Sequence, residues 1–195
     1  MTAAIIVAAG RGTRMGPDVD KLFLEVAGRP VVAHTWARFD ATPGIDHLVL
    51  VVRAGMESAF HELAASLRLQ KPFQLVPGGA ERQDSVWNGL AALPAQINIV
   101  AIHDGARPCT SPRTISATIE AARTAGAAVA AQRVIDTVKT SDNGRVIAGH
   151  LDRSRLWAVQ TPQAFQVSVI RRALSFAKLA RIVRPFAVSG SSTEM

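Results

Sequence analysis

The sequence is short of cysteine and of long apolar runs, and each shortage excludes a class of protein. Cys109 is the single cysteine among 195 residues, so the chain cannot form an internal disulfide. This favours a reducing, cytoplasmic setting. No apolar run approaches the roughly 18 residues that span a bilayer, so we predict no membrane association. The apolar N-terminal run has no basic segment before it, which argues against a secretory signal.

Aromatic and acidic residues are also scarce. Tyrosine is absent, aromatic residues make up 5% of the chain, and 15 acidic residues face 22 Lys and Arg, for a net charge of +7. The basic residues are spread along the chain and are not interleaved with aromatics, so we predict no nucleic-acid partner. We interpret the excess as attraction for phosphorylated metabolites, with an ordinary solvated surface as the alternative.

Alternating strand and helix patterns are abundant. Continuous β-rich runs such as Leu48–Val52 are typical of strands covered on both faces, and apolar residues recur between them at helical spacing. We expect strands at residues 3–8, 48–52, 73–76, 97–102 and 127–131, and helices around 32–39, 60–67, 81–93, 112–122 and 167–174. This order predicts an α/β fold with a Rossmann-like, doubly wound, mostly parallel sheet, in one domain over residues 1–195.

Residues 134–157 break the alternation and predict a protruding β-arm. The runs Ile135–Lys139 and Arg145–Ala148 are prone to form strands, and they flank a segment that ends in Asn143-Gly144. An Asn-Gly pair between such runs is a strong hairpin signal. A lone hairpin is only marginally stable in water, so we expect the arm to pack against a second subunit or against its own domain.

The first predicted strand runs directly into a loop rich in glycine and basic residues. Its three glycines are Gly10, Gly12 and Gly16, and its basic residues are Arg11, Arg14 and Lys21. Glycines let the backbone approach a ligand closely, and successive N–H groups form an anion-binding concavity. The third glycine falls one position too late for a dinucleotide fingerprint, and no Walker A tripeptide follows. The loop therefore predicts a phosphate site of another type, with a solvated glycine turn as the alternative.

Two further loops follow predicted strands at the edge where open α/β sheets bind ligands. Residues 78–85 combine glycines with Ser85 and predict either a nucleotide-base loop or a helix cap. Residues 103–108 carry Asp104, a predicted ligand of Mg²⁺, which is often held by one or two carboxylates plus substrate phosphates. We interpret His103 as structural, and Arg107 as the partner in an internal ion pair rather than a phosphate ligand.

Taken in order, these motifs resemble one enzyme family. The segments are AAGRGTRMG, GGAERQDSV, HDGARP, DTVK, the pair Asp152-Arg153, and TPQAF. Over residues 3–174 the chain resembles the 2-C-methyl-D-erythritol 4-phosphate cytidylyltransferases of the non-mevalonate isoprenoid pathway. Each motif is weak alone, and the ordered set carries the resemblance. The ribitol-5-phosphate cytidylyltransferases share most of these motifs and are the alternative.

The resemblance implies a sugar-nucleotidyltransferase-like fold, a homodimer joined by the arm, and Mg²⁺-dependent transfer of a cytidylyl group from CTP to a sugar-alcohol phosphate. Arg14 and Lys21 match the catalytic cations. Asp104 matches a residue near the metal and the sugar phosphate. Thr137 and Arg153 match arm residues that grip the substrate phosphate across the dimer, and Thr161 matches a substrate-site threonine. The implied CTP contacts are Ala8, Ala9, Gly10, Gly79, Ala80, Ser85 and Gly105.

The chain departs from the family pattern after residue 174. The family continues with a Thr-Asp pair, another strand, an aspartate near the metal and a lysine, and none of these is found in residues 175–195. A truncated, frameshifted or altered tail would account for this. The departure keeps open a second alternative, a relative that binds CTP without catalysis.

Overall fold

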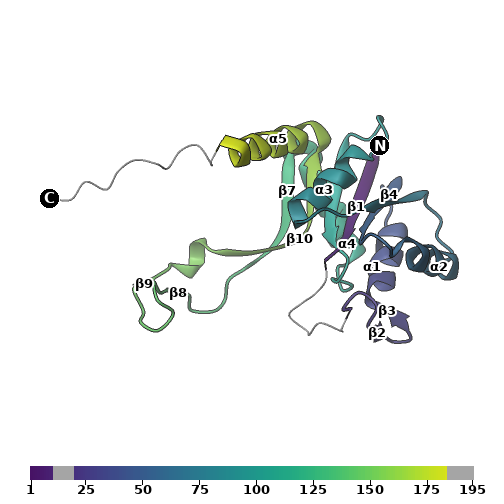
Figure 1. Cartoon of the computed structure of the whole chain (residues 1–195). Coiled ribbons are helices and arrows are strands. Elements are labelled where there is room, and N and C mark those ends of the chain that lie inside the picture. Colours follow the sequence, from purple (N-terminus) through teal and green to yellow (C-terminus); the bar gives the residue numbers. More distant parts are fainter. Residues whose placement is uncertain (11–19, 184–195) are drawn as a thin grey trace.

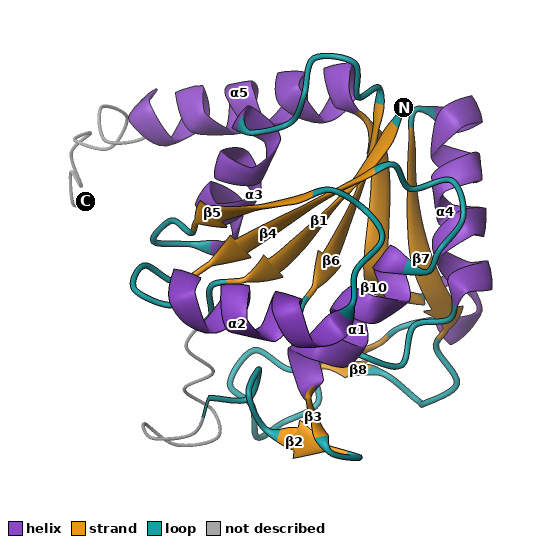
Figure 2. Ribbon diagram, turned by 90° about the vertical axis from the view of Figure 1, so that its right-hand side faces the viewer, coloured by secondary structure: helices purple, strands orange, loops and turns teal. Residues whose placement is uncertain are grey.

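The computed structural model describes residues 1–10 and 20–183, and a six-stranded sheet lies at its centre (Figures 1 and 2). The spatial order is β5 (Phe73–Pro77), β4 (His47–Val52), β1 (Thr2–Ala8), β6 (Ile99–Asp104), β10 (Trp157–Gln166) and β7 (Ala127–Arg133). The first four strands are parallel, and β10 runs antiparallel to both of its neighbours. The predicted α/β class with a mostly parallel sheet is confirmed.

Helices cover both faces of this sheet (Figure 2). One face packs against α1 (Val31–Asp40), α2 (Glu57–Leu67) and α4 (Pro112–Ala125). The other face packs against α3 (Arg82–Ala91) and α5 (Val167–Val183). Strands covered on both sides need apolar residues at successive positions, which is why β1 and β4 read as continuous apolar runs.

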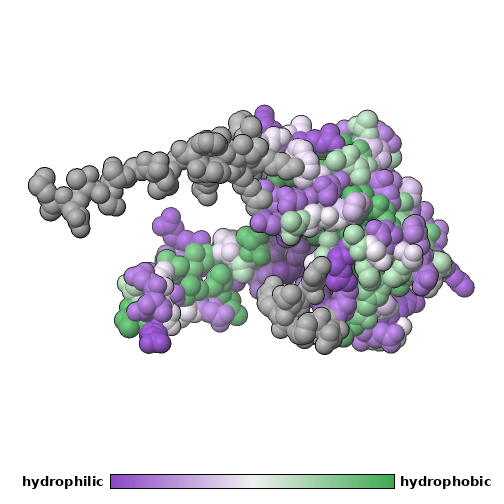
Figure 3. Space-filling view, in the orientation of Figure 1, coloured by the Kyte–Doolittle hydropathy of each residue, from purple (hydrophilic) through white to green (hydrophobic). Residues whose placement is uncertain are grey.

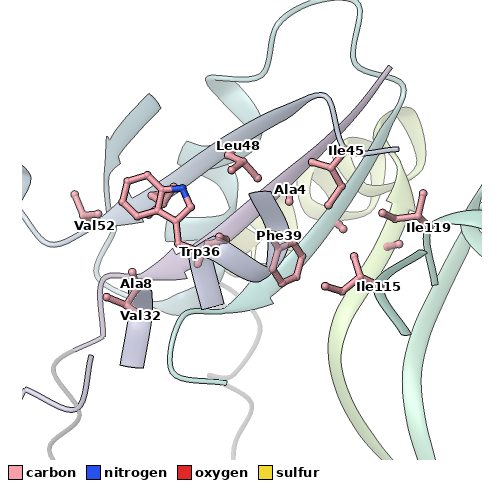
Figure 4. Packing of buried hydrophobic residues seen from close by; sticks show 14 of the residues in the cluster. Ala4, Ala8, Val32, Trp36, Phe39, Ile45, Leu48, Val52, Ile115 and Ile119 are labelled. Carbon is pink, nitrogen blue, oxygen red and sulfur yellow. The ribbon is translucent and has the colours of Figure 1, made fainter. Parts of the chain in front are cut away.

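The helical spacing of α1 turns its large side chains onto the sheet. Val32, Trp36 and Phe39 are fully buried, as the i, i+4, i+7 pattern predicts. They pack over alternate residues of β1 and β4 in the larger of the two cores (Figure 4). The ring of Trp36 lies 4.9 Å from that of Phe73 in an edge-to-face contact. This core holds the carboxyl ends of the strands in place.

Helix α3 lies unusually close to the sheet because Gly89 faces it. A Cβ atom at Gly89 would lie 2.8 Å from Ile5 Cγ2 and 3.1 Å from Val51 Cγ2. Any side chain would push the helix away from β1 and β4. The small residue thus fixes the height of α3, whose first turn borders the functional cleft described below.

The N-terminus of α4 follows the predicted signal. The hydroxyl of Ser111 accepts a hydrogen bond from Thr114 N at 3.1 Å, and Pro112 occupies the first helical position. Two short strands outside the main sheet, β2 (Glu25–Val26) and β3 (Arg29–Pro30), form a hairpin that the sequence did not predict.

Strand β10 was also missed, because the prediction placed no strand over residues 157–166. The run contains Pro162, and a proline within a run argues against a central strand. The structure accommodates it at a register shift between Val159 and Gln163, where the ladder to β7 is interrupted. The following helix was predicted at 167–174 and continues to Val183 as α5.

Between β7 and β10 the chain leaves the sheet as an arm, residues 134–156 (Figure 1). Its ladder is shorter than predicted: β8 (Lys139–Thr140) pairs with β9 (Gly149–His150) over two residues on each side, so the long strands expected at 135–139 and 145–148 are wrong. Asn143 Oδ1 accepts from Arg145 N and Val146 N at 2.9 and 3.0 Å. This side-chain turn at Asn143 forms the end of the hairpin, in the segment where the Asn-Gly pair predicted it. A short 3-10 turn, η2 (Arg153–Arg155), leads back toward β10.

Within the described part of the chain, no helix is long and apolar enough to cross a membrane.

Candidate functional site

The carboxyl ends of β1, β4, β5 and β6 meet around a cleft of about 940 Å³. Open α/β sheets bind their ligands at this edge. Nine of the residues predicted from the sequence line the cleft: Ala8, Ala9, Gly10, Lys21, Gly79, Ala80, Ser85, Asp104 and Gly105. The topology therefore brings together three loops that are separated by up to about a hundred positions in the sequence.

The floor of the cleft is a tight junction between β1 and the residues after β6. Gly105 N donates to Val7 O at 2.9 Å. A Cβ at Gly105 would lie 3.2 Å from that oxygen and 3.3 Å from Leu22 Cδ2. Only a residue without a side chain fits here without displacing a neighbour, so the backbone of the 103–108 loop lies directly beside the end of β1.

One wall is the glycine loop between β5 and α3. Gly78 N donates to Val52 O at 2.8 Å, which extends the β4–β5 ladder past the strand end. Ser85 is 2% exposed, and its hydroxyl accepts from Gly79 N at 3.1 Å. Ser85 thereby holds the loop in shape, while the cap of α3 is at Glu81, as the helix-cap alternative expected. Its own O–H proton remains to be donated to a ligand in the cleft.

A Cβ at Gly78 would lie 2.3 Å from Ala9 Cβ and 3.2 Å from Ser85 Oγ. The ends of β1 and of the glycine loop are thus in direct contact. These two segments form one continuous rim of backbone, and a flat ligand can approach it closely.

The opposite corner carries Asp104 between two arginines. Arg82 donates to Asp104 Oδ1 from Nε at 3.1 Å and from Nη2 at 2.9 Å, and Arg107 Nε donates to Oδ2 at 3.0 Å. Burial opposes ionisation of Asp104, but the charges and hydrogen bonds of Arg82 and Arg107 outweigh it and hold its pKa below the ordinary value. The carboxylate is therefore ionised. The predicted ion pair of Arg107 is present, and Arg107 also donates to the side chain of Gln160.

His103 lies on the α1 face of β6 and does not line the cleft. It is fully buried, its ring is 4.7 Å from that of Phe39, and its Nε2 lies 3.0 Å from Arg107 O. Burial lowers its pKa, so the imidazole is neutral near pH 7. This is the structural placement that the sequence analysis preferred.

The cationic side of the cleft is lined by Lys21 and Arg53. Asp20 bonds to Arg53 through Oδ2 and accepts from Leu22 N at 3.1 Å through Oδ1. The sequence did not identify Arg53 and Arg82 as site residues. Arg53 is the first residue after the buried run 48–52, so the rule that ligands lie beyond strand ends would have found it. The other catalytic prediction, Arg14, lies outside the described residues.

The side chains of the cleft could hold a divalent cation only if a single protein carboxylate served as its ligand from the protein. Among the described residues, no group of three or more His, Cys, Asp or Glu could enclose a metal ion. Two carboxylates line the described part of the cleft, those of Asp104 and Glu81, and the sequence prediction concerns Asp104, each of whose oxygens offers more than one acceptor position. Mg²⁺ accepts such an arrangement when substrate phosphates and water complete its shell.

The remaining predicted residues lie away from the cleft lining. Thr161 is 7% exposed, and its hydroxyl accepts from Asp104 N at 3.5 Å, so it lies directly behind the acid. Thr137 and Arg153 are exposed on the arm, where Arg153 Nη1 donates to Ile135 O at 2.6 Å. A smaller depression of about 380 Å³ lies on the arm beside Arg153. One chain therefore does not bring the arm residues into its own cleft.

The arm also exposes apolar side chains, which appear as green surface amid polar residues in Figure 3. On the arm the exposed fractions are 80% for Ile135 and 66% for Val146 and Ile147, and the adjoining end of β10 exposes Trp157 at 52% and Val159 at 53%. Arg133 stacks over the Trp157 ring at 4.8 Å.

A glycine-rimmed, cation-lined cleft at the carboxyl edge of a mostly parallel sheet is the arrangement of the nucleotidyltransferase-like α/β proteins. The family model described as "IspD: 2-C-methyl-D-erythritol 4-phosphate cytidylyltransferase" matches residues 2–183. The chain belongs to this family, and the predicted resemblance is confirmed.

Individual relatives agree with this membership. A protein named 2-C-methyl-D-erythritol 4-phosphate cytidylyltransferase from Pelotomaculum thermopropionicum is 45% identical over 172 residues, which is 88% of this chain and 72% of that protein. The protein of the same name from Geobacillus kaustophilus is 46% identical over 91% of this chain and 77% of its own length. The crystal structure of 4-diphosphocytidyl-2C-methyl-D-erythritol synthase from Anaerococcus prevotii superposes with a TM-score of 0.81 at 30% identity, over 100% of this chain and 78% of that one.

Proposed function

We propose that this protein transfers a cytidylyl group from CTP to 2-C-methyl-D-erythritol 4-phosphate and releases pyrophosphate, a step of isoprenoid precursor synthesis. The observation that carries the proposal is the family match over residues 2–183 together with the cleft in which nine predicted site residues converge. A reducing, cytoplasmic setting is part of the proposal, because a chain with one cysteine forms no internal disulfide that would call for an oxidising compartment.

The glycine rim supplies a binding site for the base and ribose of CTP. Backbone groups of Ala8, Ala9, Gly10, Gly79 and Ala80 would contact the nucleotide. Ser85 would donate its remaining proton to the base edge, and Gly105 would contact the ribose. The reason for backbone recognition is geometric, since a side chain at Gly78 would collide with Ala9 and one at Gly105 would crowd the backbone oxygen of Val7. Such a preformed wall loses little conformational entropy on binding.

The reaction itself is an in-line displacement at the α-phosphorus. An oxygen of the sugar phosphate forms a new bond to this phosphorus while the bond to the bridging oxygen of the β-phosphate breaks, and pyrophosphate carries that electron pair away. The attacking oxygen is already anionic at neutral pH, so no general base is required. His103 is buried and does not line the cleft, so it is not placed to act as one.

Charge that accumulates on the phosphoryl oxygens has to be stabilised by cations placed in advance. Lys21 lines the cleft, and Arg14 is proposed to act beside it. Fixed cations aimed at developing charge contribute several kcal/mol each, in order of magnitude. Asp104 would hold Mg²⁺, which when bound supplies further neutralisation of phosphate charge. Arg82 and Arg107 keep the carboxylate ionised for this role.

A homodimer is part of the proposal, with Thr137 and Arg153 of each arm gripping the sugar phosphate in the partner's cleft and Thr161 supporting it from behind Asp104. Two observations support this. The arm residues do not line the cleft of their own chain, and the arm exposes apolar side chains such as Ile135 at 80%. Apolar surface on an extended arm is stabilised when a second copy covers it.

One assay tests the proposed reaction. The purified protein is given CTP, Mg²⁺ and either 2-C-methyl-D-erythritol 4-phosphate or ribitol 5-phosphate, and pyrophosphate release is followed. We expect release with the first substrate and little with the second. Release with ribitol 5-phosphate alone would replace the proposed substrate. CTP binding without release in either case would reduce the chain to a nucleotide-binding relative.

A further inference from the structure

The cationic wall of the cleft contains an ion pair that the proposed reaction does not use. Arg53 follows β4 directly and lines the cleft, and Asp20 directly precedes Lys21. The guanidinium of Arg53 bonds to Asp20 Oδ2, and the two side chains are only 27% and 24% exposed. The contact joins positions 33 residues apart in the sequence. It therefore ties the segment that presents Lys21 to the end of a core strand.

Asp20 is fixed at several of its atoms. Its Oδ1 accepts from Leu22 N at 3.1 Å and its backbone oxygen accepts from Phe23 N at 3.0 Å, so it begins the turn that contains Lys21. On the far side of Lys21, Leu22 is 3% exposed and its oxygen accepts from Val32 N at 3.0 Å. Lys21 is thus held between two anchored residues, and Arg53 supplies the charge that anchors the first.

The same ion pair solves an electrostatic problem. A carboxylate next to the lysine of a phosphate site repels the phosphates and competes for the ammonium group. Arg53 satisfies the Asp20 carboxylate, and among residues 1–10 and 20–183 the ammonium group of Lys21 forms no ion pair. A guanidinium suits this task because it stays charged and bonds carboxylates in a fixed geometry.

We infer that Arg53 is a positioning residue for Lys21: it occupies the Asp20 carboxylate, fixes the turn that carries the lysine, and leaves the ammonium group available for the phosphates of the nucleotide. Arg53 acts through Asp20 and not by contacting the nucleotide itself. The inference rests on the proposed function only for the identity of the nucleotide.

The proposed role of Arg53 predicts that the effects of substituting Arg53 and Asp20 are not additive: removing the Asp20 charge should partly restore the activity lost at Arg53. Arg53→Gln frees the Asp20 carboxylate to bind Lys21 and to repel phosphate, so kcat/KM for CTP should fall roughly 10-fold to 100-fold. Asp20→Asn removes the negative charge and should cost less. The double variant Asp20→Asn/Arg53→Gln removes the freed carboxylate as well, and should be at least about threefold more active than Arg53→Gln alone. Arg53→Lys keeps the charge and should also exceed Arg53→Gln.

The experiment measures pyrophosphate release for these four variants and CTP binding by calorimetry without the sugar phosphate. The matched control is Arg38→Gln, an exposed arginine near the end of α1, which should match the wild type in both assays. Partly exposed ion pairs contribute little to stability, so thermal midpoints should shift by about 4 °C or less. If Arg53→Gln fails to fold, the comparison of Arg53→Lys with Asp20→Asn carries the test, with both expected to bind CTP close to wild-type strength.

Some outcomes overturn the inference. A double variant no better than Arg53→Gln, or Arg53→Lys as weak as Arg53→Gln, would assign Arg53 a direct contact with the nucleotide. Full activity of the Arg53→Gln variant would show that Arg53 has no role in the site. A wild-type protein that binds CTP but releases no pyrophosphate would refute the proposed reaction only, since the order of CTP dissociation constants among the variants still tests Arg53.

Discussion

The nucleotide cleft and the arm are built in opposite ways. The cleft lies on the carboxyl ends of buried strands, and its glycine rim is held by backbone hydrogen bonds from Gly78 to Val52 and from Gly105 to Val7. The arm has a ladder of two residues on each side and exposes Ile135 and Val146. The proposed nucleotide site is thus preformed by one chain, whereas the proposed substrate grip depends on surface that one chain leaves uncovered.

The first test asks how much of the reaction the cleft supplies. Arg14→Ala and Lys21→Ala should each lower kcat by roughly 10²–10³-fold, because each removes a cation aimed at the transition-state charge. CTP affinity should fall only modestly, since the glycine rim remains. Pyrophosphate release and calorimetric CTP binding measure the two effects. Arg172→Ala, an exposed arginine on α5, is the control. Unchanged kcat in both cation variants would contradict the proposed chemistry.

The second test asks whether the arm serves a neighbour's cleft. Arg14→Ala and Arg153→Ala variants should each be inactive alone. After subunit exchange, a mixed dimer has one cleft in which both residues are intact, so random mixing should restore about one quarter of wild-type activity. Exchange is verified with differently tagged subunits. Absence of rescue after verified exchange would place Arg153 in its own subunit's site or outside the chemistry.

The third test compares two glycines within the cleft. In Gly78→Ala the new methyl would meet Ala9 Cβ at 2.3 Å, whereas at Gly10 nothing lies within 4 Å. Gly78→Ala should therefore destabilise the fold by roughly 1–3 kcal/mol, and Gly10→Ala by no more than about 0.5 kcal/mol. Urea midpoints measure both. A loss of CTP binding in the stable Gly10→Ala variant would show that a ligand approaches this backbone, while equal stability losses would mean that the rim is not rigid.

The smallest expected effect is the pH dependence of stability beneath the cleft. Burial lowers the pKa of His103 below the ordinary 6.5, so the unfolded chain binds a proton more readily than the folded one. The contribution of His103 to stability should fall as the pH drops from 7 through 6.5 toward the folded pKa, by at most about 2 kcal/mol at pH 5. Urea unfolding of the wild type and of His103→Gln measures it, and His103→Gln should show a weaker dependence. The exposed His61→Gln should retain the full dependence.

Local patterns were sufficient to predict the elements that form the cleft. Three such patterns are the helical spacing of Trp36 and Phe39, the apolar run of β4 and the Ser111-Pro112 helix start. Each pattern depends only on residues that are a few positions apart in the sequence. Because three loops follow parallel strands, the rule on strand ends was enough to bring Gly10, Ser85 and Asp104 to one edge of the sheet.

What the sequence did not reveal depends on contacts between distant segments. Pro162 argued against β10, and only pairing with both β6 and β7 stabilises that strand. The arm's register is set by a side-chain turn at Asn143 rather than by the Asn-Gly pair alone. The bonds of Arg53 to Asp20 and of Arg82 to Asp104 join residues 33 and 22 positions apart, and no local pattern reports them.

The narrow seat of α3 on the sheet has a mechanical consequence. Because Gly89 lies directly against Ile5 and Val51, α3 cannot move away from the sheet without breaking a core contact. The glycine loop that leads into α3 is therefore a fixed wall of the cleft.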